Sequence, residues 1–294
     1  MLAGEYAVLA GGEAITVPLR LFFASLKQKG QASDSELFKK STSSLKNLYA
    51  YLQKLPEKSF HARSNLSKFN EILKKGYYID SSIPEGYGIG SSAAVSALVY
   101  DQFFEAHSEL SLQKQKDDLA TIESFFHGKS SGVDALSSFL NQPIHFSANG
   151  PELINYINPT RHESGYRFFL LDSRTTLTTA PLVKHFNSKM KETEFRDVIT
   201  NDLLVLNTKF IGSLLKKSVS DPAKIFRSIS NLQWKYFRKM IPESIEDIWM
   251  QGQISDLYSL KLNGSGGGFM LGISHKDSRA SVIEQISGFE LTWL

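Results

Sequence analysis

Apolar and polar positions follow two different periods along this chain. Alternating or continuous apolar runs, which are typical of β-strands, cover 14–24, 76–83, 166–171, 258–262 and 269–273. Apolar residues at helical spacing predict helices over 35–55, 93–106, 112–126 and 195–217. Asp221 followed by Pro222 has the sequence of a helix N-cap and first turn, and it predicts a further helix through Met240. Because strands and helices interleave without regular βαβ spacing, we expect an α+β fold rather than a doubly wound α/β fold.

The length and the turn residues predict two domains. At roughly 150 residues per domain, 294 residues make about two domains, each long enough to bury its own core. Turn-forming residues cluster at Asn149, Gly150 and Pro151, so we place the boundary there and predict domains of residues 1–149 and 150–294. The sequence has no fixed-period repeat, which argues against a solenoid or a propeller.

Composition excludes several classes of protein. The 33 Lys and Arg against 30 Asp and Glu leave a net charge of +3, too small a bias to indicate binding to nucleic acid or to an anionic membrane. The sequence has no cysteine, which removes disulfides, thiolate metal sites and cysteine nucleophiles and fits a reducing compartment. No apolar stretch is long enough for a membrane-spanning helix. We expect a cytoplasmic monomer or homodimer without nucleic-acid or membrane partners.

Glycines and two serines lie between a predicted strand and a predicted helix in the segment YYIDSSIPEGYGIGSSAA, residues 77–94. Glycines let a backbone approach a phosphate closely, and the amides at the positive end of a helix favour an anion. The serine hydroxyls add ligands for a phosphate oxygen or Mg²⁺. The spacing matches neither common nucleotide-binding motif, and the same residues also fit a purely structural turn. The candidate phosphate-binding residues are Gly86, Gly88, Gly90, Ser91, Ser92 and Ala93.

Two carboxylates stand close together in the segment ESFFHGKSSGVD, residues 123–134. Glu123 lies on a predicted helix that Gly128 ends, and Asp134 follows on a glycine-flanked turn that can be oriented independently. Phosphoryl transfer needs a metal ion at the phosphate oxygens and a residue that orients or deprotonates the attacking hydroxyl, and two carboxylates can divide these tasks. The alternative is a solvated helix residue paired with His127 and an ordinary turn aspartate.

Two further loops carry candidate binding residues. The run NGSGGG at 263–268 joins two predicted strands, and it makes either a tight hairpin or a backbone that closes over a ligand. The segment 172–182 follows another predicted strand, and its hydroxyls and Arg174 can receive a carboxylate, although a polar loop without function fits equally well. The candidates in these loops are Gly266, Gly267, Arg174 and Thr179.

Motifs along the chain resemble, in the same order, those of one kinase family. PEGYGIGSSAA resembles the PxxxGLGSSAA phosphate loop of the family named for galactokinase, homoserine kinase, mevalonate kinase and phosphomevalonate kinase, the GHMP kinases. GEYAVLAGGEAI is similar to the GEHAVVYGxPAI type, and KLNGSGGGF is similar to the KLTGAGGGG loop. HGKSSGVD is similar to the HGxPSGVD segment of mevalonate kinases in particular. The motifs extend from Gly4 to Gly268, so the resemblance covers both predicted domains.

The resemblance implies an α+β fold with a ribosomal-protein-like N-terminal domain, a ferredoxin-like C-terminal domain and an active-site cleft between them. It implies ATP and Mg²⁺ as cofactors, Ser92 and Glu123 as magnesium ligands, Asp134 as the catalytic residue, and Gly266 and Gly267 beside the nucleotide. The implied reaction transfers the γ-phosphoryl group of ATP to the primary hydroxyl of mevalonate, in isoprenoid precursor synthesis. The residues expected to contact the small-molecule substrate are Glu5, Tyr6, Arg174 and Thr179.

The chain also departs from the family pattern. Tyr6 stands where mevalonate kinases carry the histidine of GEH, and Leu177 stands where the arginine of a VPRSTKxLV-type segment falls, although Thr178 and Thr179 keep their hydroxyls. A Pro-Gly-Lys segment that precedes the GE turn in the family has no counterpart before Gly4, so we expect either missing N-terminal sequence or impaired transfer. The alternatives are therefore phosphomevalonate or another small alcohol as the acceptor, or a catalytically silent protein that binds a nucleotide.

Overall fold

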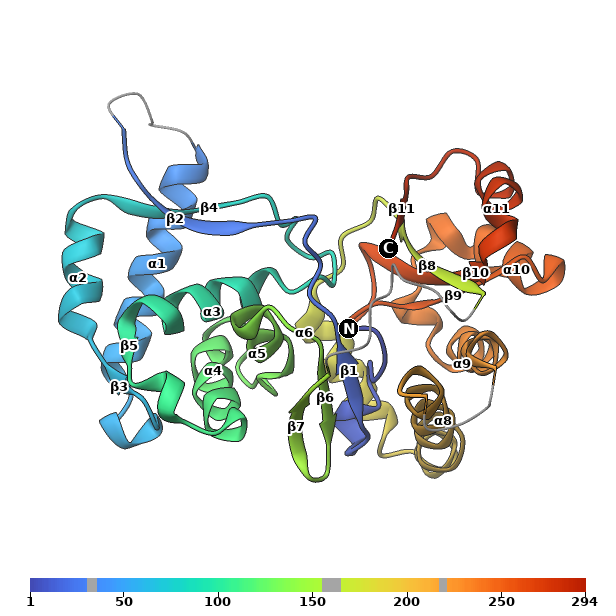
Figure 1. Ribbon diagram of the computed structural model, residues 1–294, viewed down its shortest axis with the longest axis horizontal. Coiled ribbons are helices and arrows are strands. Elements are labelled where there is room, and N and C mark those ends of the chain that lie inside the picture. The colour runs from blue at the N-terminus through green and yellow to red at the C-terminus, as the bar shows by residue number, and fades with distance from the viewer. Residues whose placement is uncertain (31–35, 155–164, 217–220) are drawn as a thin grey trace.

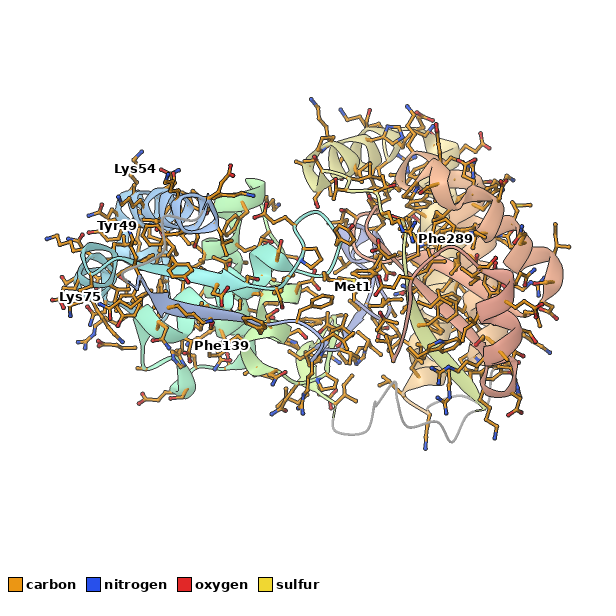
Figure 2. The ribbon with its side chains drawn as sticks, turned by 90° about the horizontal axis from the view of Figure 1, so that it is seen from above. Met1, Tyr49, Lys54, Lys75, Phe139 and Phe289 are labelled. Carbon is orange, nitrogen blue, oxygen red and sulfur yellow. The ribbon has the colours of Figure 1, made fainter. Side chains whose placement is uncertain are left out.

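The computed structural model describes residues 1–30, 36–154, 165–216 and 221–294, and it divides into two halves (Figure 1). The helices from α1 to α5 lie in one half, and the strands β8 to β11 lie in the other with α8 to α11. Met1 lies between the two halves, whereas Phe289 lies within the C-terminal half (Figure 2). Residues from both halves can therefore meet near the start of the chain.

The first half consists of helices that pack around small antiparallel sheets. Its helices are α1 Glu36–Lys54, α2 Leu66–Lys74, α3 Ser91–Phe103, α4 Leu112–His127 and α5 Val133–Leu140. One sheet has the order β1-β6-β7, with β1 Ala14–Thr16, β6 Ile144–Ser147 and β7 Gly150–Leu153. Two strand pairs are formed by β2 Ala24–Gln28 with β4 Tyr77–Ser81, and by β3 Arg63–Ser64 with β5 Phe104–Glu105. Short 3₁₀ helices cover Val8–Ala10, Glu57–Ser59 and His107–Glu109.

The second half is built on one four-stranded antiparallel sheet with the order β11-β8-β10-β9. Its strands are β8 Tyr166–Asp172, β9 Tyr258–Leu262, β10 Phe269–His275 and β11 Leu291–Trp293. Its helices are α6 Thr179–Lys189, α7 Thr193–Val198, α8 Leu204–Leu214, α9 Pro222–Tyr236, α10 Glu246–Ser255 and α11 Arg279–Gln285, with 3₁₀ turns at Arg238–Met240, Glu243–Ile245 and Lys276–Ser278. In chain order, helices separate β8 from β9 and β10 from β11. This arrangement, with the strand order in the sheet, confirms the expected ferredoxin-like topology.

Two hydrophobic cores correspond to the two halves, and β1 lies between them. The first core contains buried residues of α1 to α5, such as Leu48, Phe69 and Tyr100. The second core contains the central strands and α9, and it also contains Tyr6 from the N-terminal turn. Because neighbouring strand residues point to opposite faces, Ala14 packs into the first core and Ile15 into the second.

Several elements lie where the sequence predicts them. Strand β9 coincides with the predicted 258–262, and Asp221 caps α9 by accepting a hydrogen bond from the Ala223 amide at 2.9 Å. The predicted helix over 195–217 contains a π-helical turn at Ile199–Leu203, which divides α7 from α8. Residues 35 and 217, the predicted ends of two helices, lie outside the described residues.

Three predicted elements are wrong in their extent. The helix predicted through Met240 ends at Tyr236, and a 3₁₀ turn follows at Arg238–Met240. The predicted strand 14–24 is interrupted after Thr16, because Pro18 has no amide to donate to a strand partner, and a separate strand begins at Ala24. The predicted helix 93–106 begins earlier, at Ser91, and ends at Phe103. Beyond this end, Phe104 and Glu105 pair with β3, so tertiary pairing overrides the local helical pattern.

Candidate active site

The glycine-serine turn connects β4 to the N-terminus of α3. Gly86, Gly88 and Gly90 have φ angles of 77°, 69° and 78°, a left-handed conformation that glycine adopts without strain. Gly90 is the N-cap of α3, and the first intrahelical hydrogen bond runs from the Ala94 amide to the Gly90 carbonyl at 2.9 Å. The amides of residues 91–93 therefore precede the helical bonding pattern, at the positive end of the helix dipole. This is the local geometry of an anion site.

Glu123 on α4 meets this helix end. Its side chain accepts a hydrogen bond at Oε1 from the Ser92 hydroxyl at 3.1 Å, and another at Oε2 from the Ser130 hydroxyl at 2.5 Å. Glu123 is only 5% exposed. Among the described residues no basic side chain forms an ion pair with Glu123, so its charge is offset by two hydroxyl donors alone.

Asp134 lies in the first turn of α5, and it also reaches the start of α3. Gly132 caps α5 with a φ angle of 72°, and a Cβ at Gly132 would lie 2.3 Å from the Lys116 carbonyl oxygen, so only glycine fits this close packing on α4. A Cβ placed on Gly90 would lie 3.9 Å from the Asp134 Cβ. Glu123 and Asp134 therefore converge on the N-terminus of α3, as the sequence predicts for a shared site.

Burial controls the electrostatics of this cluster. The pKa of Glu123 is raised to about 7, chiefly by burial. The hydrogen bonds from Ser130 and Ser92 lower this pKa, and the nearby Asp134 carboxylate contributes to its rise. A buried carboxylate without a cationic partner is costly to ionise, and a bound metal ion would remove that cost.

The donor set fits Mg²⁺. A carboxylate and a hydroxyl are oxygen ligands of the kind that Mg²⁺ prefers, and Mg²⁺ is usually held by one or two carboxylates together with substrate phosphates. No group of three or more His, Cys, Asp or Glu residues that could hold a metal occurs in the described part of the chain. Ser92 and Glu123 are therefore suited to share an ion with a phosphate ligand, but not to form an all-protein cage.

A pocket of about 330 Å³ opens beside Asp134. Its wall includes residues 88–90 and Asn263 from the second glycine loop, and the rest mixes polar and apolar side chains, with Asp101, Leu19 and Phe139 among the lining residues. Of the predicted substrate contacts, Glu5, Tyr6, Arg174 and Thr179, none lines this pocket.

The second glycine loop packs directly against the first. Asn263 donates a hydrogen bond from Nδ2 to the Gly88 carbonyl at 3.3 Å, and a Cβ at Gly88 would lie 2.3 Å from the Asn263 carbonyl oxygen. Gly266 and Gly267 are equally confined, because added Cβ atoms would lie 2.5 Å from the Met240 carbonyl oxygen and 2.7 Å from the Leu177 Cβ. The loop thus brings residues of the second half to the phosphate turn, next to Leu177 rather than an arginine.

Tyr6 and Thr179 come together at Ser265 in this loop. The Tyr6 hydroxyl donates to the Ser265 carbonyl at 2.6 Å, and the Thr179 and Ser265 hydroxyls are 3.0 Å apart. Tyr6 is buried against Phe186 and Phe237, and this burial raises its pKa.

Glu5 and Arg174, the other predicted substrate contacts, are already engaged within the protein. Glu5 forms a buried ion pair with Lys261 on β9, with side chains 4% and 1% exposed, and burial lowers the pKa of Lys261 while Glu5 opposes that shift. Arg174 is exposed, and its guanidinium lies over the Phe289 ring, 6.0 Å from the ring centroid. The structure therefore does not bring Arg174 into the cluster around Ser92, Glu123 and Asp134.

Sequence reasoning missed four residues that shape this region. Lys261, Asn263 and Ser265 lie in or beside the second glycine loop, and Ser130 lies in the HGKSSGVD segment. Their positions in or beside recognised motifs indicated that these residues could have a structural role, since polar residues at glycine-rich turns often bond to neighbouring backbone. Their partners, however, are distant in sequence or depend on side-chain rotamers, and no local pattern specifies them.

Comparisons with known proteins bear on the family and on the fold. Residues 48–142 match the family model of the GHMP kinases N terminal domain. No curated protein matches the chain by sequence. The described helices include none long and apolar enough to cross a membrane.

Solved structures of several kinases have a similar fold. Mevalonate kinase of L. major, solved in complex with R-mevalonate, is 15% identical with a TM-score of 0.65, covering 100% of this chain and 92% of that one. Mevalonate kinase of Methanococcus jannaschii is 18% identical with a TM-score of 0.60, covering 99% and 94%. Phosphomevalonate kinase of Streptococcus pneumoniae is 14% identical with a TM-score of 0.61, covering 99% and 94%. Likeness at these identities concerns the fold. The chain therefore contains a GHMP kinase N-terminal domain and has the fold of the GHMP kinases over its length, as its motifs predict.

Proposed function

We propose that this protein transfers the γ-phosphoryl group of ATP to a hydroxyl of a small alcohol, with mevalonate as the first acceptor to test. The observation that carries the proposal is the hydrogen bond between Ser92, at the start of α3, and the buried carboxylate of Glu123, with Asp134 beside Gly90. An anion site, a metal-binding pair and a carboxylate for the acceptor thus occupy one place, which is the arrangement that phosphoryl transfer requires.

Each of these groups has a separate role. The glycine turn and the amides of residues 91–93 bind the phosphates of ATP, with Gly266 and Gly267 closing on them from the second half. Ser92 and Glu123 hold Mg²⁺, which when bound neutralises phosphate oxygens. Asp134 orients the acceptor hydroxyl and accepts its proton. Glu5 and Tyr6 hold the second glycine loop in place through Lys261 and Ser265.

We assign nucleotide binding to residues 1–149 and closure of the cleft to residues 150–294. The contact between Asn263 and Gly88 supports this division, because each glycine loop comes from a different side of the proposed boundary. That the protein is a monomer or a homodimer stays a prediction. A cytoplasmic location, which rests on the cysteine-free sequence, also stays a prediction.

Different observations support different acceptors. The HGKSSGVD segment and the fold shared with a mevalonate kinase bound to R-mevalonate support mevalonate. Tyr6 supports phosphomevalonate or another alcohol, and a phosphomevalonate kinase has a similar fold, whereas Leu177 in place of an arginine supports a silent binding protein. Phosphoryl transfer to a panel of mevalonate, phosphomevalonate, homoserine and galactose, measured with purified protein, separates these acceptors. Nucleotide binding without transfer to any of them would favour a silent binding protein.

The role of Asp134 is tested by Asp134→Asn. Removal of a positioned general base costs about 10²- to 10⁴-fold, so turnover should fall by that factor while calorimetry shows nearly unchanged nucleotide affinity. Asp101→Asn is the matched control, because Asp101 is another carboxylate that lines the same pocket but lies late in α3. Wild-type turnover in the Asp134 variant, or an equal loss in both variants, would remove Asp134 from the mechanism.

A further inference from the structure

Ser130 is the centre of a small hydrogen-bond network between the Glu123 carboxylate and the turn that leads to Asp134. Its hydroxyl donates to Glu123 Oε2 at 2.5 Å and accepts a hydrogen bond from the Gly132 amide at 3.0 Å. Its own amide donates to the Ser124 hydroxyl at 3.1 Å. One residue thus links the helix that carries Glu123 to the turn that leads into α5 and Asp134.

We propose that Ser130 is a positioning residue for magnesium binding. This inference rests on the proposed function, in which Glu123 is a magnesium ligand. A buried carboxylate is stable only where donors satisfy its oxygens, and Ser130 and Ser92 donate to different oxygens of Glu123. The Ser130 bond fixes the rotation of the carboxylate, so that the oxygen facing Ser92 stays directed toward the start of α3. Mutation of partners of this kind, which orient a ligand without touching the metal, typically costs about 10- to 100-fold in metal affinity.

The same hydroxyl also fixes the turn before Asp134. Gly132 has a left-handed backbone, and the bond from its amide to Ser130 holds the turn at this residue. The Ser130 hydroxyl therefore contacts both the metal carboxylate and the turn that leads to the acceptor carboxylate. Removing the hydroxyl should loosen both carboxylates, with the larger effect on Glu123, which bonds to it directly.

The motif resemblance does not assign this role. Ser130 stands where the HGxPSGVD pattern has proline, and proline has no hydroxyl to donate. Ser131 stands where the pattern has its own serine, and within the described residues its hydroxyl accepts one long hydrogen bond, from the Val133 amide at 3.4 Å. The chain therefore supplies its own control, a neighbouring serine in the same loop without a hydrogen bond to Glu123.

The test measures nucleotide affinity by calorimetry, with a non-hydrolysable ATP analogue, in Mg²⁺ and in EDTA. In Ser130→Ala the gain in affinity that Mg²⁺ provides should fall by about 10-fold or more, while affinity in EDTA changes less than about 2-fold. Ser130→Thr keeps the hydroxyl and should restore most of the gain, and Ser131→Ala should match the wild type. Where the wild type turns over an acceptor, the KM for Mg²⁺ should rise in Ser130→Ala more than kcat falls.

Several outcomes would overturn the proposal. An unchanged magnesium gain in Ser130→Ala, or an equal loss in Ser131→Ala, would show that the hydroxyl does not position Glu123. If Ser130→Ala does not fold, as judged by its thermal transition, Ser130→Cys provides the same comparison with a weaker donor of similar size. A wild type without any magnesium gain would overturn the proposed function itself, whereas a gain that Ser130→Ala retains overturns only the role of Ser130.

Discussion

The buried ion pair between Glu5 and Lys261 gives a stability prediction whose size follows from the structure. The two residues are 256 positions apart, and their side chains are 4% and 1% exposed. Lys261→Met removes the ammonium group and keeps an apolar stem of similar length. The carboxyl group of Glu5 then has no cation beside it, and it must either remain charged in the interior or take up a proton.

Protonation of Glu5 sets the upper limit of the stability lost in Lys261→Met. A glutamate in the unfolded chain has a pKa of about 4.3, so holding the carboxyl neutral at pH 7 costs about 2.7 × 1.36, or roughly 3.7 kcal/mol. At pH 5 the same step costs only about 1 kcal/mol. A buried carboxyl without a cation binds its proton more tightly in the folded state than in the unfolded state. The contribution of this proton to stability is therefore greatest at low pH and is lost as pH rises, which gives the variant a pH slope in addition to that of the wild type.

Urea unfolding at pH 5 and pH 7, followed by circular dichroism, measures this slope. We expect Lys261→Met to lower the free energy of unfolding by about 3 to 4 kcal/mol at pH 7, and by about 2 to 3 kcal/mol less at pH 5. The double variant Glu5→Gln, Lys261→Met is the control, since it has no carboxyl to protonate and should show no added slope. A cost below about 1 kcal/mol at pH 7, or an equal cost at both pH values, would refute the reasoning.

Two further predictions concern the site. Gly88→Ala places a Cβ 2.3 Å from the Asn263 carbonyl oxygen, so it should displace the phosphate turn and lower nucleotide affinity at least about 10-fold in calorimetry. Gly11→Ala, whose φ of 83° is equally strained but where no atom lies within 4 Å, should cost about 1 to 2 kcal/mol of stability and leave affinity unchanged. Because the pKa of Glu123 is about 7, its carboxyl becomes protonated below that pH, and the magnesium gain in nucleotide affinity should fall by up to about 10-fold per pH unit. A gain that stays constant from pH 7.5 to pH 5.5 would contradict this, and Glu123→Gln should show little gain at any pH.

The sequence by itself determined the chemistry-bearing loops. Gly86, Gly88 and Gly90 adopt a left-handed backbone in the turn that the sequence predicts before a helix, and Asp221 caps the helix that it precedes. These features are local, because glycine conformation and capping depend on a few neighbouring residues. The strand 258–262 is equally local, since Tyr258, Leu260 and Leu262 alternate with polar residues, which is the period of a strand.

Only the tertiary structure decided which of these loops meet. Ser130 bonds to Glu123, Lys261 pairs with Glu5, and Arg174 turns to Phe289 instead of joining the site. Such contacts depend on how helices and sheets pack and on which rotamers that packing allows, and no residue pattern along the chain encodes either one. The same physics placed Ala14 and Ile15 in different cores, because a strand at the junction of two packed halves must satisfy both of its faces.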